Sequence, residues 1–336
     1  MIDWVTGTFY CDHDPEKLNN GRVFSMNPDG EIDWHCEKVL NVEGSYSSNI
    51  QIKSATSGSI WFSGNPVKFL QGHNIFGTDD LVYLLGRFFD ALLKIDSLGL
   101  APTDIQYENM KDGLVMLTRV DINQSWLLNS KSDVLSWIRA AGNCARLKHR
   151  GAGQFSGDTL YFGKNSRRWA VKCYSKGHEL TVKGRALHAD LSHPLLVEYA
   201  EKALRLELVM RSMHLKDCLL NVACNWLPGT AKMLLCSTVL DNLEITDNMP
   251  IKDTVLETLP VRLKGVYALW LQGTDLRAEM ARPTFYRWRK SLLAYGVDIA
   301  IIQDSEPKSN VIPLIRYLEA IPAGVPDWAY ELGLVA

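Results

Sequence analysis

The sequence predicts an α+β fold, with an antiparallel-sheet domain over residues 1–215 and a mainly helical domain over residues 216–336. Three observations lead to this prediction. Short apolar runs separated by Asn, Pro, Asp and Gly fill the first hundred positions, as in antiparallel sheets. Strand-like and helix-like segments then alternate up to about residue 215, which is typical of α+β domains. Beyond that point the apolar residues recur mostly at helical spacing.

The elements of the first domain follow one another clearly along the chain. Strands are expected in "GRVFSM", "EIDWHCEKVLNV", "SNIQIKS" and "GSIWFSG". Over residues 79–98 the apolar residues recur at three and four after two aspartates, which predicts an amphipathic helix. Next come the strand "GLVMLTRVDINQSW", a helix in "SKSDVLSWIRAAGNCARLK" that begins near Ser132, and a hairpin of "DTLYFG" with "RRWAVKCYSK". A helix in "SHPLLVEYAEKA" and the strand "LRLELVMR" complete the domain.

The second domain contains a segment, residues 260–299, that is similar to a helix-turn-helix unit. It has a helix, a break with Gly, a short helix and then a basic aromatic helix that starts at Pro283. With "TFYRWRKSLLAYG" in the recognition position, Arg287, Arg289 and Lys290 would contact phosphates or base edges. A helical hairpin with surface bases fits the same pattern, so both interpretations stay open.

Composition excludes several classes of protein. At 46% hydrophobic and 22% charged, the 336 residues can bury real cores. No apolar run approaches the roughly 18 residues that span a bilayer, so no membrane span is expected. The first residues lack the pattern of a secretory signal, and the seven cysteines include no C-x-x-C pair. We therefore expect a cytoplasmic protein with reduced thiols and neither a disulfide scaffold nor a zinc site.

The formal net charge of −2 hides a strong asymmetry along the chain. Residues 1–45 contain nine acids and three bases, a net charge of −6. Residues 146–216 contain fourteen bases and six acids, a net charge of +8. The basic segment favours a polyanionic partner, although a solvated surface with clustered charges remains an alternative.

The strand "RRWAVKCYSK" carries an unusual set of side chains. At the strand period of two, Lys172, Tyr174 and Lys176 point to one face, and apolar residues point to the other. Glu179 follows beyond an expected turn at Gly177. A tyrosine among cations is thus predicted on one face of a sheet.

Two further strands place acids opposite an apolar face. In "RVDIN", Asp121 and Asn123 share a face, and in "LRLELVMR", Glu207 lies opposite the leucines. If the three strands are neighbours in one sheet, Asp121, Glu207 and Glu179 meet beside Tyr174. Carboxylate and amide oxygens are the hard ligands that suit Mg²⁺ or Mn²⁺.

Such a cluster is suited to a phosphodiester. The metal would polarise a phosphate oxygen, Lys176 would offset transition-state charge or help deprotonate Tyr174, and the phenolate would attack to give a phosphotyrosine. Free tyrosine has a pKa of about 10, so activation is a physical requirement. The alternative, in which the acids pair with nearby arginines and Tyr174 packs as an ordinary aromatic, stays open.

Several longer segments carry a resemblance to a known family. They are "MIDW", "NPDGEI", "GNPVKFLQGHNIFGTDDL" at 64–81, "RVDIN" at 119–123, "LYFGKNSRRWAVKCYSKGHEL" at 160–180, "LRLELVMR" at 204–211 and "NVIPLIRYLEAIPAGVPDW" at 310–328. Together they resemble the replication initiators of filamentous phages, the gene II/X family of phage and plasmid rolling-circle replication proteins. The resemblance implies a nuclease fold related to the HUH-like initiators.

The resemblance also implies an activity and its partners. Proteins of this family nick one strand of the double-stranded replicative form at the origin, keep the 5′ phosphate on a tyrosine, and later rejoin the displaced strand. The 3′ hydroxyl is left for the host polymerase, so origin DNA and the host replication helicase and polymerase are expected partners. Assembly of several copies at the origin is a further expectation.

The family pattern assigns roles to individual residues. By position, Tyr174 is the implied nucleophile and Lys176 its companion. Related nucleases hold the metal with a His-hydrophobic-His strand, and "DIN" at 121–123 stands in that place with oxygen ligands. The implied metal ligands are Asp121, Glu207, Glu179, Asn123 and His73. The candidate DNA-binding residues are Arg167, Arg168, Lys172 and Asn74, together with Arg287, Arg289 and Lys290 of the segment similar to a helix-turn-helix unit.

Two points in this assignment remain open. His73 in "LQGHN" has a second interpretation, in which it fixes its loop through hydrogen bonds to the main chain. The whole chain also has a rival function, that of an origin-binding or operator-binding regulator that does not cut. The tyrosine hydroxyl is essential to the nickase and nearly irrelevant to the regulator.

Overall fold

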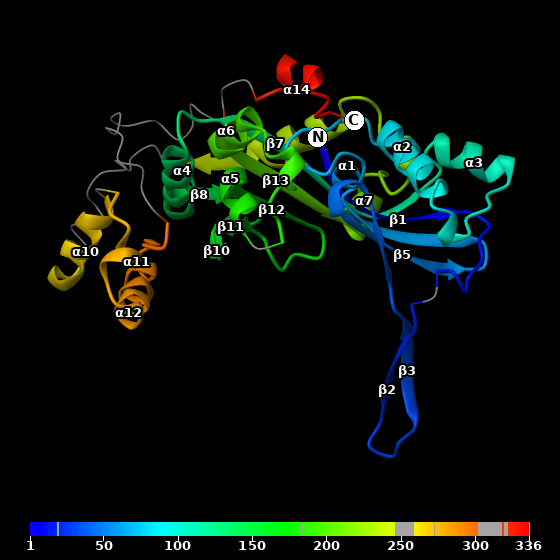
Figure 1. The fold of residues 1–336 in the computed structure, drawn as a ribbon, viewed down its shortest axis with the longest axis horizontal. Coiled ribbons are helices and arrows are strands. Elements are labelled where there is room, and N and C mark those ends of the chain that lie inside the picture. The colour runs from blue at the N-terminus through cyan, green and yellow to red at the C-terminus, as the bar shows by residue number, and fades with distance from the viewer. Residues whose placement is uncertain are drawn as a thin grey trace.

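The structure, a computed structural model, describes residues 1–245, 259–301, 318 and 322–335, apart from positions 19, 183 and 272. Its main feature is a nine-stranded sheet whose neighbouring strands are all antiparallel (Figure 1). In spatial order the strands are β10 (Gln154–Ser156), β11 (Thr159–Phe162), β12 (Trp169–Ser175), β13 (Ala203–Arg211), β7 (Met116–Leu127), β1 (Ile2–Tyr10), β6 (Ser59–Gly64), β5 (Asn49–Thr56) and β4 (Leu40–Glu43). The predicted α+β class with an antiparallel sheet is therefore confirmed.

The strand β1 is the one central element that the sequence analysis did not assign. It lies between β7 and β6, and its segment "IDWVTGTFY" is rich in the β-branched and aromatic residues that favour strands. Asp3 and Gly7 within it weaken the strand signal, because both residue types are depleted in strands. The most N-terminal residues consequently form the middle of the sheet.

One face of the sheet is covered by helices and forms the main hydrophobic core. Alternate residues such as Val120, Ile122, Leu206 and Leu208 point into this core. The helices that contribute to it are α1 (Pro66–Gln71), α2 (Leu81–Leu93), α3 (Asp104–Lys111), α4 (Lys131–Cys144), α7 (Ser212–Asp217) and α8 (Thr230–Thr238). The predicted helices around residues 79–98 and 132 are thus present, and Ser130 caps the second by accepting from Asp133 N.

A smaller apolar cluster lies against the opposite, polar face of the sheet. It contains Ile75, Leu196, Ala200, Ala329 and Leu334 among others. The helices of this layer are α5 (Lys176–Thr181), α6 (Pro194–Lys202) and the C-terminal α14 (Asp327–Glu331). Segments far apart in the sequence therefore enclose the polar face.

Small elements surround these layers. The hairpin of β2 (Arg22–Met26) and β3 (Ile32–Glu37) extends far from the body of the protein (Figure 1). A three-stranded sheet joins β14 (Leu243–Ile245), β8 (Ala145–Leu147) and β9 (Gly151–Ala152). Short 3₁₀ helices are η1 (Ser45–Ser47), η2 (Asp96–Leu98), η3 (Ala189–Leu191), η4 (Ala223–Asn225) and η5 (Leu240–Asn242).

The C-terminal helices form a separate core. They are α10 (Val261–Leu271), α11 (Leu276–Glu279) and α12 (Arg282–Leu293), packed around Trp270, Phe285 and Leu292. The helices predicted within residues 260–299 are therefore confirmed. The predicted boundary at residue 216 does not match the packing, because the main core continues to Val239. Of the family-like segment 310–328, only 318 and 322–328 lie among the described residues.

The predicted end of the tyrosine strand is wrong. β12 ends at Ser175, whose side chain accepts from His178 N and caps α5, so Lys176 begins a helix instead of continuing the strand. Gly177 consequently lies inside α5 and forms no turn. A Cβ atom on Gly177 would lie 2.5 Å from Glu201 Cα of α6. The glycine is required by this close contact between the two helices.

Gly177→Val tests this contact. Because the new Cβ would meet backbone atoms, α5 or α6 must shift, and we expect a loss of roughly 1–3 kcal/mol in the free energy of unfolding. Thermal unfolding measures it. The matched control is Gly265→Val in α10, where a Cβ meets nothing within 4 Å. Equal melting temperatures for the two variants would contradict the tight α5–α6 contact.

Candidate active site

The polar face of the sheet carries a row of polar and charged side chains from neighbouring strands. In the register of β12, β13 and β7, Lys172 lies opposite Glu207, and Glu207 lies opposite Asn123. Tyr174 lies opposite Arg205 in the same way. Directly paired residues point to the same face of a sheet, so these side chains share one surface. The sequence analysis required the three strands to be neighbours if the acids were to meet Tyr174, and β12, β13 and β7 are neighbours in the sheet.

Tyr174 is a buried phenol with one carboxylate partner. Its hydroxyl donates to Glu207 Oε2 at 3.1 Å, and only 8% of the residue is exposed. Burial, together with the carboxylates of Glu207 and Glu179, raises the pKa of the Tyr174 phenol well above its usual value. Burial also raises the pKa of Glu207, although Lys172 opposes that shift. The phenol is therefore protonated, and an acceptor for its proton is already in contact.

Two buried carboxylates beside the tyrosine are held by two cations. Lys172 Nζ forms an ion pair with Glu207 Oε1 and lies 3.6 Å from Asp121 Oδ2. Arg119 binds Asp121 through two hydrogen bonds, Nε to Oδ1 at 2.8 Å and Nη2 to Oδ2 at 2.6 Å. Buried carboxylates require such partners, because desolvation of an unpaired charge is costly. Of the pairs left open by the sequence, Asp121 with Arg119 is observed, and Glu207 pairs with Lys172.

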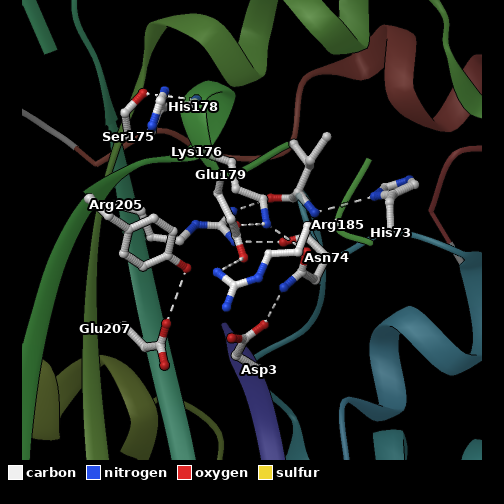
Figure 2. Close-up of polar contacts among 12 residues, drawn as sticks. Asp3, His73, Asn74, Ser175, Lys176, His178, Glu179, Arg185, Arg205 and Glu207 are labelled. Atoms are coloured by element: carbon white, nitrogen blue, oxygen red, sulfur yellow. Dashed lines mark hydrogen bonds and ion pairs between the residues drawn. The ribbon is translucent and has the colours of Figure 1, made fainter. Parts of the chain in front are cut away.

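Lys176 has a different set of partners. Its ammonium donates to Asn74 Oδ1 at 2.6 Å and to Glu179 Oε2 at 2.7 Å, as Figure 2 shows. Only 1% of Lys176 is exposed, and burial together with the nearby Arg205 lowers the pKa of its ammonium. Glu179 also lies 3.8 Å from Arg185 Nη1. Lys176 is thus a buried cation beside, but not within, the Asp121 and Glu207 cluster.

Arg205 connects the strands to the loop after α1. It is 0% exposed and donates to Ser125 Oγ at 3.1 Å, Asn74 O at 2.6 Å and Ile75 O at 2.8 Å. The side chain of Asn74 donates to Asp3 Oδ1 at 2.8 Å. Arg205 and Asp3 were not among the predicted site residues. Their signal in the sequence is weak: a charged residue within an otherwise apolar strand segment.

His73 is bound to the main chain through both ring nitrogens. Nε2 lies 2.8 Å from Leu334 O, and Nδ1 accepts from Ile75 N at 3.3 Å. Burial is the main cause that lowers the pKa of His73 to about 4. The structure thus places His73 in the loop-fixing arrangement that the sequence left open, and its nitrogens are not free to bind a metal.

These side chains line one cavity of about 600 Å³. Its walls include Asp3, Asn74, Asp121, Tyr174, Lys176 and Glu207, and Lys172 and Arg185 also contribute. A second histidine, His178, lines the same cavity and pairs with Asp158 at 2.8 Å. This cavity collects most of the predicted catalytic and metal-binding residues in one place.

The predicted metal ligands do not form a single shell. Among the described residues, no group of three or more His, Cys, Asp or Glu side chains could hold a metal ion. Glu179 is bound to Lys176, and His73 to the main chain. Three of the predicted ligands, Asp121, Glu207 and Asn123, remain together on neighbouring strands.

Asn123 is a buried amide opposite Glu207 in the sheet. It is 2% exposed, and neither atom of its side-chain amide has a hydrogen-bond partner among the described residues. Buried side-chain amides are normally hydrogen-bonded, so a buried amide without a partner in the protein suits a position where an ion or a water molecule binds. An amide oxygen beside the carboxylates of Asp121 and Glu207 fits Mg²⁺ or Mn²⁺, which prefer oxygen ligands.

The predicted DNA-binding residues differ in their exposure and in whether they already form an ion pair within the protein. Arg168 forms an ion pair with Asp217, and Arg289 binds Asp298 through two hydrogen bonds at 2.7 and 2.6 Å. The exposed residues of this set are Arg167, Arg168, Arg287 and Lys290, and of these Arg168 is the one in the ion pair with Asp217. Lys172 and Asn74 line the cavity. Arg289 is therefore bound within the C-terminal core, and its role as a DNA contact stays a prediction.

Comparison with known proteins defines the class of the chain. Residues 1–228 match the family described as the N-terminal part of the gene II replication-associated protein, and residues 260–335 match the family described as its C-terminal part. Both families consist of replication-associated proteins. The chain belongs to this family, the gene II-type replication initiators of filamentous phages. The family predicted from the sequence is thus confirmed.

Two relatives span most of the chain. The replication-associated protein of Enterobacteria phage I2-2 is 39% identical over 336 residues, which cover 97% of this chain and 96% of the phage protein. That of Salmonella phage IKe is 22% identical over 320 residues, covering 80% and 74%. No solved structure matches the chain. The relation of its sheet to HUH-like nucleases therefore stays a prediction.

The buried His73 predicts a pH dependence of stability. Its pKa of about 4 lies below the ordinary value of 6.5, so the unfolded chain binds the proton first as pH falls. This contribution to stability is complete above pH 6.5 and is lost as pH falls toward 4, by up to about 3 kcal/mol. Urea unfolding at pH 7 and pH 4.5 measures it. His73→Gln should show a shallower decline, and an identical decline in both proteins would contradict a buried neutral imidazole.

Proposed function

We propose that the chain nicks one strand of the double-stranded replicative form at the phage origin, with Tyr174 as nucleophile, and later rejoins the displaced strand. The observation that carries this proposal is the hydrogen bond from the Tyr174 phenol to Glu207 beside a second carboxylate, in a cavity large enough for a nucleotide. Membership of a replication initiator family supports it.

The proposed cleavage is a direct in-line displacement. Tyr174 Oη forms a bond to phosphorus, its proton passes to Glu207 Oε2, and the bond from phosphorus to the 3′ oxygen breaks. The leaving 3′ oxygen takes a proton from water, and the 5′ phosphate stays on Tyr174. Rejoining reverses these events: a 3′ hydroxyl gives its proton to the hydroxide or water beside it and attacks phosphorus, the bond from phosphorus to Tyr174 Oη breaks, and the proton returns from Glu207 to the phenolate.

Other residues of the cavity stabilise charge in this proposal. Lys176, held by Asn74 and Glu179, is a buried ammonium positioned to offset charge on the pentavalent transition state. Asp121, Glu207 and Asn123 would hold Mg²⁺ or Mn²⁺, which when bound polarises a phosphate oxygen. Glu207 would act both as a metal ligand and as the proton acceptor of Tyr174, through different oxygens. Oε1 faces the position that Lys172 occupies, and Oε2 accepts from the Tyr174 hydroxyl.

The setting of the reaction is also proposed. The protein would act in the host bacterial cytoplasm, where the 3′ hydroxyl primes the host polymerase and a host helicase opens the duplex. In the part of the chain that the structure describes, no helix meets the length and hydrophobicity that a bilayer-spanning segment requires. Exposed bases of α12 would recognise the duplex origin, with assembly of several copies there.

Tyr174→Phe tests the nucleophile. We expect a loss of nicking of more than about a thousandfold, with origin binding retained, because the variant lacks only one hydroxyl. The protein and Mn²⁺ are incubated with a 5′-labelled and, separately, a 3′-labelled single-stranded oligonucleotide that spans the nick site. Wild-type protein should retain only the 3′-labelled DNA after denaturing electrophoresis.

The matched control is Tyr83→Phe, which removes an exposed phenol that does not line the cavity. It should form the covalent product as the wild type does. Unchanged nicking by Tyr174→Phe would refute the assignment of the nucleophile. Specific binding without any covalent product in the wild type would instead make the chain an origin-binding regulator that does not cut.

Two neighbouring arginines of α12 should behave differently. Arg287→Ala should lower affinity for the duplex origin by roughly 1–3 kcal/mol without changing the melting temperature, because Arg287 is exposed. Arg289→Ala should lower the free energy of unfolding by about 1–3 kcal/mol, because it strips buried Asp298 of its partner. Gel-shift titration and thermal unfolding separate the two. The same stability loss in both variants would contradict this division.

A further inference from the structure

Lys172 occupies the position where the proposed metal would be expected. Its ammonium contacts Glu207 Oε1 and lies 3.6 Å from Asp121 Oδ2, so it bridges the two carboxylates. Asn123, directly opposite Glu207 on the neighbouring strand β7, has a buried amide without a hydrogen-bond partner among the described residues. The Lys172 ammonium, a monovalent cation, thus lies between the two carboxylates, while the amide oxygen of Asn123 binds no group among the described residues.

Charge balance decides whether Lys172 can stay when a divalent cation enters. Asp121 and Glu207, when ionised, carry two negative charges, which Arg119 and Lys172 neutralise. A divalent cation added to this buried set would leave a net charge of about +2, which is costly away from water. If Lys172 withdraws and a phosphate approaches the metal, the charges balance again.

Lys172 has room to withdraw, and a phosphate would attract it. Its side chain is 23% exposed and lines the cavity, whereas the carboxylates it holds are almost fully buried. Lysine is a compact charge on a flexible stem and binds phosphates readily. A nucleic acid strand in the cavity would therefore offer this ammonium a second partner.

We propose that Lys172 is a tethered competitor for the divalent cation, which holds the Asp121 and Glu207 pair until a DNA phosphate draws it away. Metal and DNA then bind cooperatively, because each makes room for the other. This inference rests on the proposed nickase function. Lys172 then has two positions, one between the carboxylates and one on the DNA backbone. In the first position it prevents the divalent cation from binding to the protein in the absence of DNA.

The experiment measures Mn²⁺ binding directly. In a Tyr174→Phe background, which keeps the DNA intact, the resonance of free Mn²⁺ is followed by electron paramagnetic resonance with and without a single-stranded oligonucleotide that spans the nick site. We expect the oligonucleotide to raise Mn²⁺ affinity by roughly tenfold or more. Lys172→Met should raise Mn²⁺ affinity without DNA by a similar factor and remove most of the DNA effect.

Two further variants keep the test decisive. Lys172→Arg retains the cation and should keep Mn²⁺ affinity low without DNA. Lys164→Met removes an exposed positive charge that does not contact the two carboxylates, and it should leave Mn²⁺ affinity nearly unchanged. Lys172→Met with unchanged or weaker Mn²⁺ binding would overturn the proposal, as would an equal gain in Lys164→Met.

Asp121→Asn separates this inference from the proposed function. If the metal lies between the carboxylates, this change should abolish Mn²⁺ binding with and without DNA. Persistent binding in Asp121→Asn would place the metal elsewhere and refute the proposed ligand set, together with the role of Lys172. A cation that binds at Asp121 but ignores Lys172 would leave the metal site intact and refute the competitor alone.

Discussion

The polar face of this sheet depends on one buried guanidinium, that of Arg205. A buried cation is tolerated only when its donors are bonded and carboxylates lie nearby. Arg205 meets this condition through Ser125 on β7 and two main-chain oxygens of the loop after α1. That loop presents Asn74, whose side chain contacts both Asp3 and Lys176. Arg205 and Asn74 thereby join three strands, the loop after α1 and the first residue of α5 into one charged network.

The same burial sets the chemistry of the face. The pKa values of two lysines in the cavity are shifted in opposite directions. Burial opposes the charge of Lys172, but the two carboxylates that it faces raise its pKa, whereas burial and Arg205 lower the pKa of Lys176. Tyr174 stays protonated among carboxylates, although an acceptor touches its hydroxyl. The proposed nucleophile is therefore held inactive by its surroundings and needs a phosphate, a cation or both before a phenolate becomes favourable.

The sequence predicted those parts of the site that follow from strand periodicity. Alternation alone placed Asp121 and Glu207 on faces away from the core, and the antiparallel pairing of three strands brought them to Tyr174. Lys176 was misplaced because a serine cap ends the strand one residue earlier. The partners of His73 could not be predicted, since its acceptor lies 261 residues away and contacts at such separation leave no local pattern.

The bond between His73 and Leu334 also has a consequence for the timing of synthesis. The described strands of the main sheet are complete by Arg211, yet the loop that carries Asn74 is closed only when Leu334 arrives. Ala323 N likewise bonds to Ser125 O on β7. At typical rates of translation, the stretch between Arg211 and Leu334 takes roughly 6 to 25 s to make. A nascent chain therefore contains every described strand of the main sheet well before Leu334 is made, so the loop that carries Asn74 is fixed only after this late segment has left the ribosome and docked.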